Sequence, residues 1–228
     1  MKLLKKHSLV IAFLSLALVA VITAGTTMAY YMASAGEKVN HFEFQEDIIA
    51  KLDEYNWDAD EGIRMVPGKE LRKDPVITNM CRMDEYVAVK ITFQHADKSA
   101  ALSQIDYDRL ISLISIDWNV GAGESQWTLV SGEGTPEQVY VYNQLLSPGE
   151  VSEPTLHSVR IHTNEDADKP MTEVDLRWLQ GIRYENGQAV PDENSLGGFN
   201  ILVEGAAIQA DSLSSPEGAY AGLLALFS

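Results

Sequence analysis

The sequence has almost none of the cysteine that builds a disulfide framework. Cys81 is the one cysteine in 228 residues, so no disulfide can form within the chain and stability must come from packing. Free cysteine usually behaves as a compact apolar side chain, and we expect Cys81 to be partly buried without a functional role. The alternative is a disulfide that links two chains.

Motifs of common hydrolases are missing as well. The sequence contains no H-E-x-x-H and no G-x-S-x-G, and no signature of an activated thiol surrounds Cys81. We therefore predict no catalytic residue and no cofactor.

Basic residues are few. Lysine and arginine number 17 against 33 acidic residues, which gives a net charge of -16. Three of the lysines stand in the first six residues, so the chain from residue 30 onward has a net charge of -19 (14 - 33). This excess repels phosphate and anionic lipid surfaces and argues against a nucleic-acid partner. It also favours divalent cations as bridges between copies.

The start of the sequence has the three parts of a secretory signal peptide: early lysines, a long apolar run and small residues around a cleavage site. We predict a signal peptide over 1–29, cut between Ala29 and Tyr30. One alternative is a cut between Ala35 and Gly36, after a second A-x-A tripeptide. Another is an uncleaved membrane anchor, although the run is slightly short of the ~20 apolar residues that span a bilayer. The remaining 199 residues (228 - 29) suffice for one core.

Beyond the leader, apolar residues recur with a period of two. Val87, Val89 and Ile91 share one face of Glu85–Phe93, which indicates an antiparallel strand with one face in a core. Similar strands are predicted at 41–49, 112–120, 126–130, 138–144, 156–163 and 199–209. Many short strands separated by Gly-rich and Pro-rich turns favour an all-β fold, an antiparallel β-sandwich.

The last of these strands breaks its own alternation. Val203 and Ile208 have opposite parity on either side of Gly205, which predicts a β-bulge near that glycine.

Short helices are expected around the sheets. A turn of helix is predicted within 106–114, and a C-terminal helix over 214–227 begins with a capping serine and Pro216. The segment 171–184 fits both a strand and a helix.

Three stretches together resemble the TasA and camelysin family of secreted proteins, whose leaders are cut by a SipW-type signal peptidase. The second stretch contains P-G-K-E-L-R-K-D-P-V-I-T-N, and the third ends in A-A-I-Q-A. In order, the stretches are 25–30 with 37–42, 65–79 with 84–90, and 140–150 with 199–210.

The resemblance implies a jelly-roll-like β-sandwich over 41–228, preceded by an N-terminal extension over 30–40. It further implies secretion to the extracellular matrix or cell surface and self-association into fibres of a biofilm matrix. The expected partners are the SipW-type peptidase, other copies of the chain, and other matrix or cell-surface components.

In TasA-like fibres the mature N-terminal segment of one subunit is added as a strand to the next. The resemblance therefore points to assembly through 30–40, with Tyr30, Tyr31, Met32 and Val39 as the assembly residues. Alternation in this segment is poor, so the sequence neither requires nor forbids insertion. The alternative is a disordered tail.

Camelysin-like members are described as metallopeptidases, so a cell-surface metallopeptidase is the alternative function. His157 and His162 are five residues apart, and that offset on a strand puts them on opposite faces, with His157 beside Val159 and Ile161. We expect that the two histidines do not bind one metal as strand neighbours, and the metal ligands, if any, stay unknown.

Acidic clusters and aromatic residues offer two further sites. The clusters 58–62 and 164–168 supply oxygen ligands for structural calcium, but neither follows the twelve-residue calcium loop, and solvated turns are favoured. A third function is a non-catalytic module that binds glycans through aromatic side chains, although burial is the favoured use of those in strands. The aromatic candidates are Trp57, Trp118, Trp127, Trp178, Tyr140 and Tyr142.

N-terminal sequencing of the exported protein tests the leader. We expect a mature chain that begins at Tyr30, because the small residues before it fit a signal peptidase. A chain that begins at Gly36 would support the second site, and a chain that keeps Met1 in the membrane fraction would contradict cleavage.

Overall fold

The computed structural model describes residues 50–58, 62, 65–96, 100–210 and 216–227. All of them belong to one compact unit, Glu46–Ser228. The predicted signal peptide, the extension 30–40 and the predicted strand 41–49 lie outside the described residues.

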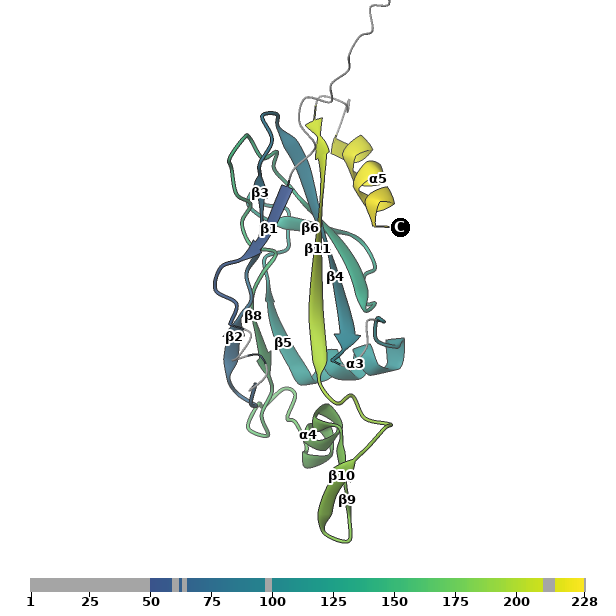
Figure 1. Cartoon of the computed structure of the whole chain (residues 1–228). Coiled ribbons are helices and arrows are strands. Elements are labelled where there is room, and N and C mark those ends of the chain that lie inside the picture. The colour runs from purple at the N-terminus through teal and green to yellow at the C-terminus, as the bar shows by residue number, and fades with distance from the viewer. Residues whose placement is uncertain (1–49, 59–61, 63–64, 97–99, 211–215, 228) are drawn as a thin grey trace, which may run out of the picture. The chain divides into compact units, whose positions relative to one another are not determined.

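The described strands form antiparallel sheets (Figure 1). The four-stranded sheet has the order β11 (Phe199–Gln209), β4 (Glu85–His95), β7 (Glu137–Tyr142) and β6 (Trp127–Ser131). The three-stranded sheet has the order β2 (Glu70–Arg72), β8 (Leu156–Ile161) and β5 (Ile114–Trp118). Two strand pairs complete the set: β1 (Ala50–Glu54) with β3 (Pro75–Asn79), and β9 (Ile182–Glu185) with β10 (Gln188–Pro191).

The predicted all-β sandwich is confirmed. On β4, Val87, Val89, Ile91 and Phe93 are fully buried, as the alternation predicts for one face. They belong to a single core cluster with inward-facing residues of the three-stranded sheet, among them Leu156, Val159 and Ile161. The two sheets therefore pack face to face around one core.

Strand β11 has no bulge, and the prediction of one at Gly205 is wrong. Its pairing with β4 is continuous from Phe199 to Gln209. Val203 packs in the main core, whereas Ile208 packs in a second cluster on the opposite face. The change of parity therefore reflects a second apolar layer and not a shift of register.

Helix α5 (Pro216–Leu226) forms that second layer on the outer face of the four-stranded sheet (Figure 1). Leu223 and Ala219 are fully buried there with Ala88 of β4 and Val141 of β7. The helix begins at Pro216, as predicted, and the predicted serine cap lies outside the described residues.

The other two helices have clear local causes. Helix α3 (Gln104–Leu113) begins two residues earlier than predicted, because the side chain of Ser103 accepts a hydrogen bond from the backbone N–H of Asp106. The segment 171–184, whose sequence fits both a strand and a helix, contains α4 (Glu173–Gln180), which is followed by β9. A reciprocal capping box joins Thr172 to Asp175, and Gly181 ends the helix in a left-handed conformation before β9.

Alanine substitution of Leu223 tests the outer layer. The buried side chain would leave a cavity beside Ala88 and Val141, so we expect Leu223→Ala to lower the free energy of unfolding by about 2–5 kcal/mol. Leu226→Ala is the matched control on the same helix, since Leu226 is 58% exposed, and we expect it to cost less than about 0.5 kcal/mol. Equal effects of the two substitutions in urea unfolding would contradict the packing of α5.

Candidate functional site

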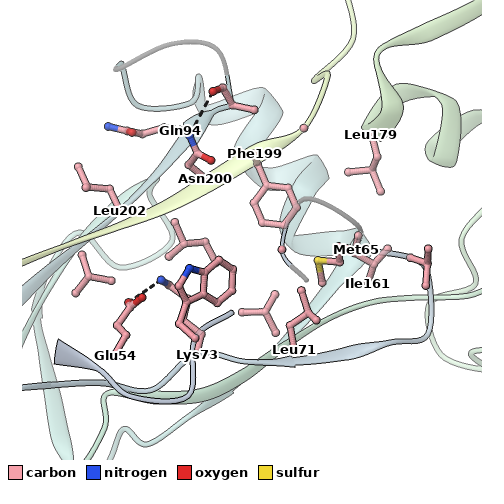
Figure 2. Close-up of a pocket in the computed structure, with 18 of the residues that line it drawn as sticks. Glu54, Met65, Leu71, Lys73, Gln94, Ile161, Leu179, Phe199, Asn200 and Leu202 are labelled. Atoms are coloured by element: carbon pink, nitrogen blue, oxygen red, sulfur yellow. Dashed lines mark hydrogen bonds and ion pairs between the residues drawn. The ribbon is translucent and has the colours of Figure 1, made fainter. Parts of the chain in front are cut away.

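A long groove opens where the two layers of the sandwich part. It has a volume of about 1130 Å³ and is lined by β11 on one side and by β1, β2 and the loop between them on the other (Figure 2). Its lining is mainly apolar, with Phe199 and Ile201 from β11, Leu71 from β2, Ile161 from β8, and Met65.

The walls of this groove are strand edges. β11 is the outermost strand of its sheet and pairs with β4 along one edge only, and none of the other described strands pairs with its second edge. β2 is likewise outermost in the three-stranded sheet. An unpaired edge presents a row of backbone N–H and C=O groups that another strand can bind.

Two glycines fix the end of the groove where β11 begins. A Cβ on Gly181 would lie 2.7 Å from Cα of Gly197, so this approach of two backbones requires glycine at position 181. The backbone N–H of Gly198 donates to the carbonyl of Leu179 at 2.8 Å. These contacts attach α4 to the start of β11 and bring Leu176 and Leu179 into the groove lining.

A buried ion pair with an aromatic ring beside it interrupts the apolar lining. We call this set of residues the Lys73 station, and it consists of Lys73, Glu54 and Trp57. The side chain of Lys73 is only 7% exposed, and its Nζ lies 2.6 Å from Oε1 of Glu54. The same nitrogen lies 4.8 Å from the centroid of the Trp57 ring, in cation–π contact. A Cβ on Gly62 would lie 2.8 Å from this ring, so a larger residue at position 62 would require the Trp57 side chain to shift.

Backbone contacts hold the station in place. The N–H of Lys73 donates to the carbonyl of His157 at 3.2 Å. Asn56 binds the carboxylate of Asp74 through its backbone N–H, at 3.0 Å, and through its side-chain amide. The start of the connection between β1 and β2 is thus attached to the residues that follow β2, beside the groove.

His157 does not lie on the face of β8 that the alternation predicts. It is the extra residue of a β-bulge between β5 and β8, where Asp117 pairs with Ser158 and Trp118 pairs with Leu156. Leu156 therefore shares the core face with Val159, and His157 is exposed, so the predicted placement of His157 beside Val159 and Ile161 is wrong.

His162 is buried and hydrogen-bonded elsewhere. Its Nε2 lies 2.6 Å from Oγ of Ser115, and the imidazole is 6% exposed. Within the described residues no group of three or more His, Cys, Asp or Glu side chains is placed to hold a metal ion.

The two acidic clusters differ in what the structure describes. Most of 58–62 lies outside the described residues. In 164–168, Asp166 accepts hydrogen bonds from the backbone N–H of Thr163 and from Arg160, whose nitrogen lies 3.0 Å away. These bonds, the backbone one foremost, lower the pKa of Asp166 to about 2. The Asp166 carboxylate therefore already has its partners within the turn.

Most of the aromatic candidates are core residues. Trp127 is fully buried and its ring lies 5.0 Å from that of Tyr142, while Trp118 stacks on Tyr140 at 5.2 Å. Trp178 is also buried and lies under Arg109, 4.4 Å from the guanidinium carbon. These five side chains therefore pack inside the protein, as favoured for the strand residues, and Trp57 lies at the groove.

A buried carboxyl group lies at the opposite end of the sandwich, and no sequence motif predicted it. Glu85 is fully buried on the core side of β4, and its backbone exchanges two 3.0 Å hydrogen bonds with Leu146. Burial raises the pKa of the Glu85 carboxyl, and the nearby Cys81 thiol partly offsets the rise. Cys81 is itself 5% exposed, in agreement with the predicted burial, and its N–H donates to Asn79.

In comparisons with known proteins, no family model matches the chain, and no similar curated protein or solved structure was found. A separate finding concerns membranes: none of the helices among the described residues is long and apolar enough to cross a bilayer.

Glu85→Gln tests the buried carboxyl. Because the pKa of Glu85 is raised above its unfolded value near 4.5, its stabilising contribution is complete below that value and is lost as pH rises through the folded pKa. The neutral glutamine avoids this loss. We therefore expect the variant to gain stability over the native protein progressively as the pH rises above about 4.5, in a series of urea unfolding measurements.

Glu133→Gln is the matched control, since Glu133 is exposed. A stability difference between Glu85→Gln and the native protein that stays constant with pH would contradict the burial of an ionisable carboxyl.

Proposed function

We propose that this protein is a secreted structural subunit that self-associates into extracellular fibres, as the resemblance to the TasA and camelysin family implies. In this proposal the segment 30–40 of one copy lies as an added strand in the groove of the next copy. The leader 1–29 is removed by a SipW-type peptidase, which frees that segment.

The observation that carries the proposal is the unpaired edge of β11 along the apolar groove. A strand that binds there would pair with the backbone of 199–203 and would cover the apolar side chains of both layers. Apolar burial of this kind supplies affinity, and the backbone edge supplies hydrogen-bond partners for the added strand.

The strong negative charge fits the same function. Copies that carry a net charge of -19 after loss of the leader repel one another in solution. Assembly is therefore expected to be stronger at higher ionic strength or with divalent cations, which screen this repulsion.

Assembly of the mature chain tests the proposed function. We expect the chain that begins at Tyr30 to form filaments visible by electron microscopy, and deletion of 30–40 to abolish them without loss of the folded domain. A synthetic peptide of sequence 30–40 is expected to compete with assembly, whereas a scrambled peptide of the same composition is the control.

Casein cleavage with and without chelator is measured on the same preparations. Chelator-sensitive cleavage without filaments would contradict the structural role and favour the metallopeptidase. Filaments that form equally well without 30–40 would contradict strand addition.

A further inference from the structure

The Lys73 station is the one place where the groove lining is both charged and buried among the described residues, and its position is unusual. Leu71 and Lys73 have the same parity along the chain, and both are buried toward the groove. Leu52 and Glu54 have the same relationship on β1, and both line the groove. The ammonium of Lys73 therefore has apolar neighbours in a groove otherwise suited to apolar side chains.

An added strand would change the solvation of this ion pair. The strand would cover Lys73 and Glu54. Removing charged groups from water costs free energy unless hydrogen-bond partners replace the water. An ammonium has three N–H donors. Glu54 accepts one of them, and the ring of Trp57 faces the same nitrogen. A strand with an acceptor at this position would therefore bind better than one with a methyl group there.

The segment 30–40 has one face with such a pattern. In a strand, its odd-numbered residues share one face, and they are Tyr31, Ala33, Ala35, Glu37 and Val39. Four of these five are apolar, and the acceptor is Glu37. The even-numbered face is mixed, since Tyr30 and Met32 share it with the polar or small residues Ser34, Gly36, Lys38 and Asn40.

We propose that the Lys73 station sets the register of assembly by binding the Glu37 carboxylate of the incoming chain. This inference rests on the proposed function and specifies the position of the added strand. With Glu37 at Lys73, Val39 lies to one side of the station, and Ala35, Ala33 and Tyr31 lie to the other. A slip by one residue turns the mixed face into the groove, and a slip by two leaves Glu37 against apolar residues.

A double-mutant cycle in the mature chain tests the contact. Glu37→Gln removes the charge of the incoming strand, and we expect it to raise the critical concentration for filament formation about tenfold. Lys38→Gln is the matched control on the opposite face, and we expect a change of less than about twofold. Both residues lie outside the described residues, and thermal unfolding of each variant checks that the folded domain is intact.

The second arm of the cycle removes the station. Lys73→Met with Glu54→Gln keeps the side-chain stems without leaving either charge unpaired. In this background we expect filaments to form and Glu37→Gln to have an effect of less than about twofold. Thermal unfolding of each monomer verifies that the sandwich is intact. If the double variant does not fold, the comparison of Glu37→Gln with Lys38→Gln still decides whether the Glu37 carboxylate contributes to filament formation.

Register is measured directly by zero-length carbodiimide cross-linking of native filaments. A cross-linked peptide pair that joins Glu37 of one copy to Lys73 of another is expected, and it should disappear in the Glu37→Gln variant.

The outcomes separate the two proposals. If the native mature chain forms no filaments, strand addition fails and the register fails with it. If filaments form but Glu37→Gln and Lys38→Gln have equal effects, or Glu37 cross-links elsewhere, the register alone is overturned.

Discussion

Strand β4 is buried on both of its faces, and the layers of the protein depend on that burial. Its inner face supplies Val87, Val89, Ile91 and Phe93 to the core between the sheets, and Ala88 on its outer face lies under α5. The strand also pairs with a neighbour along each edge, β7 on one side and β11 on the other. Because β4 already has both neighbours, β11 is the outermost described strand on its side of the sheet, and the groove forms beside it.

The groove combines an apolar lining beside an open strand edge, which favours association, with a charged pair, which disfavours it. Proteins usually prevent association at an open edge by covering or charging that edge. Here one charged pair, Lys73 with Glu54, stands within the lining. In the proposed register, this pair disfavours a strand that is apolar throughout. It favours a strand with a carboxylate at the matching position.

Alternation predicted the strands that supply one continuous apolar face to the core between the sheets. The strands at β4, β6, β7 and β8 were predicted within a few residues, because one face of each meets a core. The prediction of a bulge in β11 failed because Ile208 meets α5, and a strand sequence does not say which later element covers its second face. The placement of His157 failed because a bulge between Asp117 and Trp118 shifts the register of β8.

The groove itself could not be predicted from local patterns. It requires that β11 and β2 be outermost in their sheets, and strand order is a property of the whole topology. Lys73 stands in the stretch 65–79 that carries part of the family resemblance, and its burial depends on Glu54 and Trp57 from a separate segment. Glu85 was equally hidden, since in sequence it is simply the polar residue that opens a strand.

The pairing of β4 with β11 also limits the order in which the structure can form. Glu85 pairs with Gln209, close to the other end of the sequence, and α5 follows later still. While the chain is being synthesised, the central strand has neither its second neighbour nor the cover of its outer face. Contacts so distant in sequence form slowly and leave apolar strands exposed in the interval. The interval between the emergence of β4 and that of α5 is therefore when the apolar faces of β4 are most exposed to aggregation.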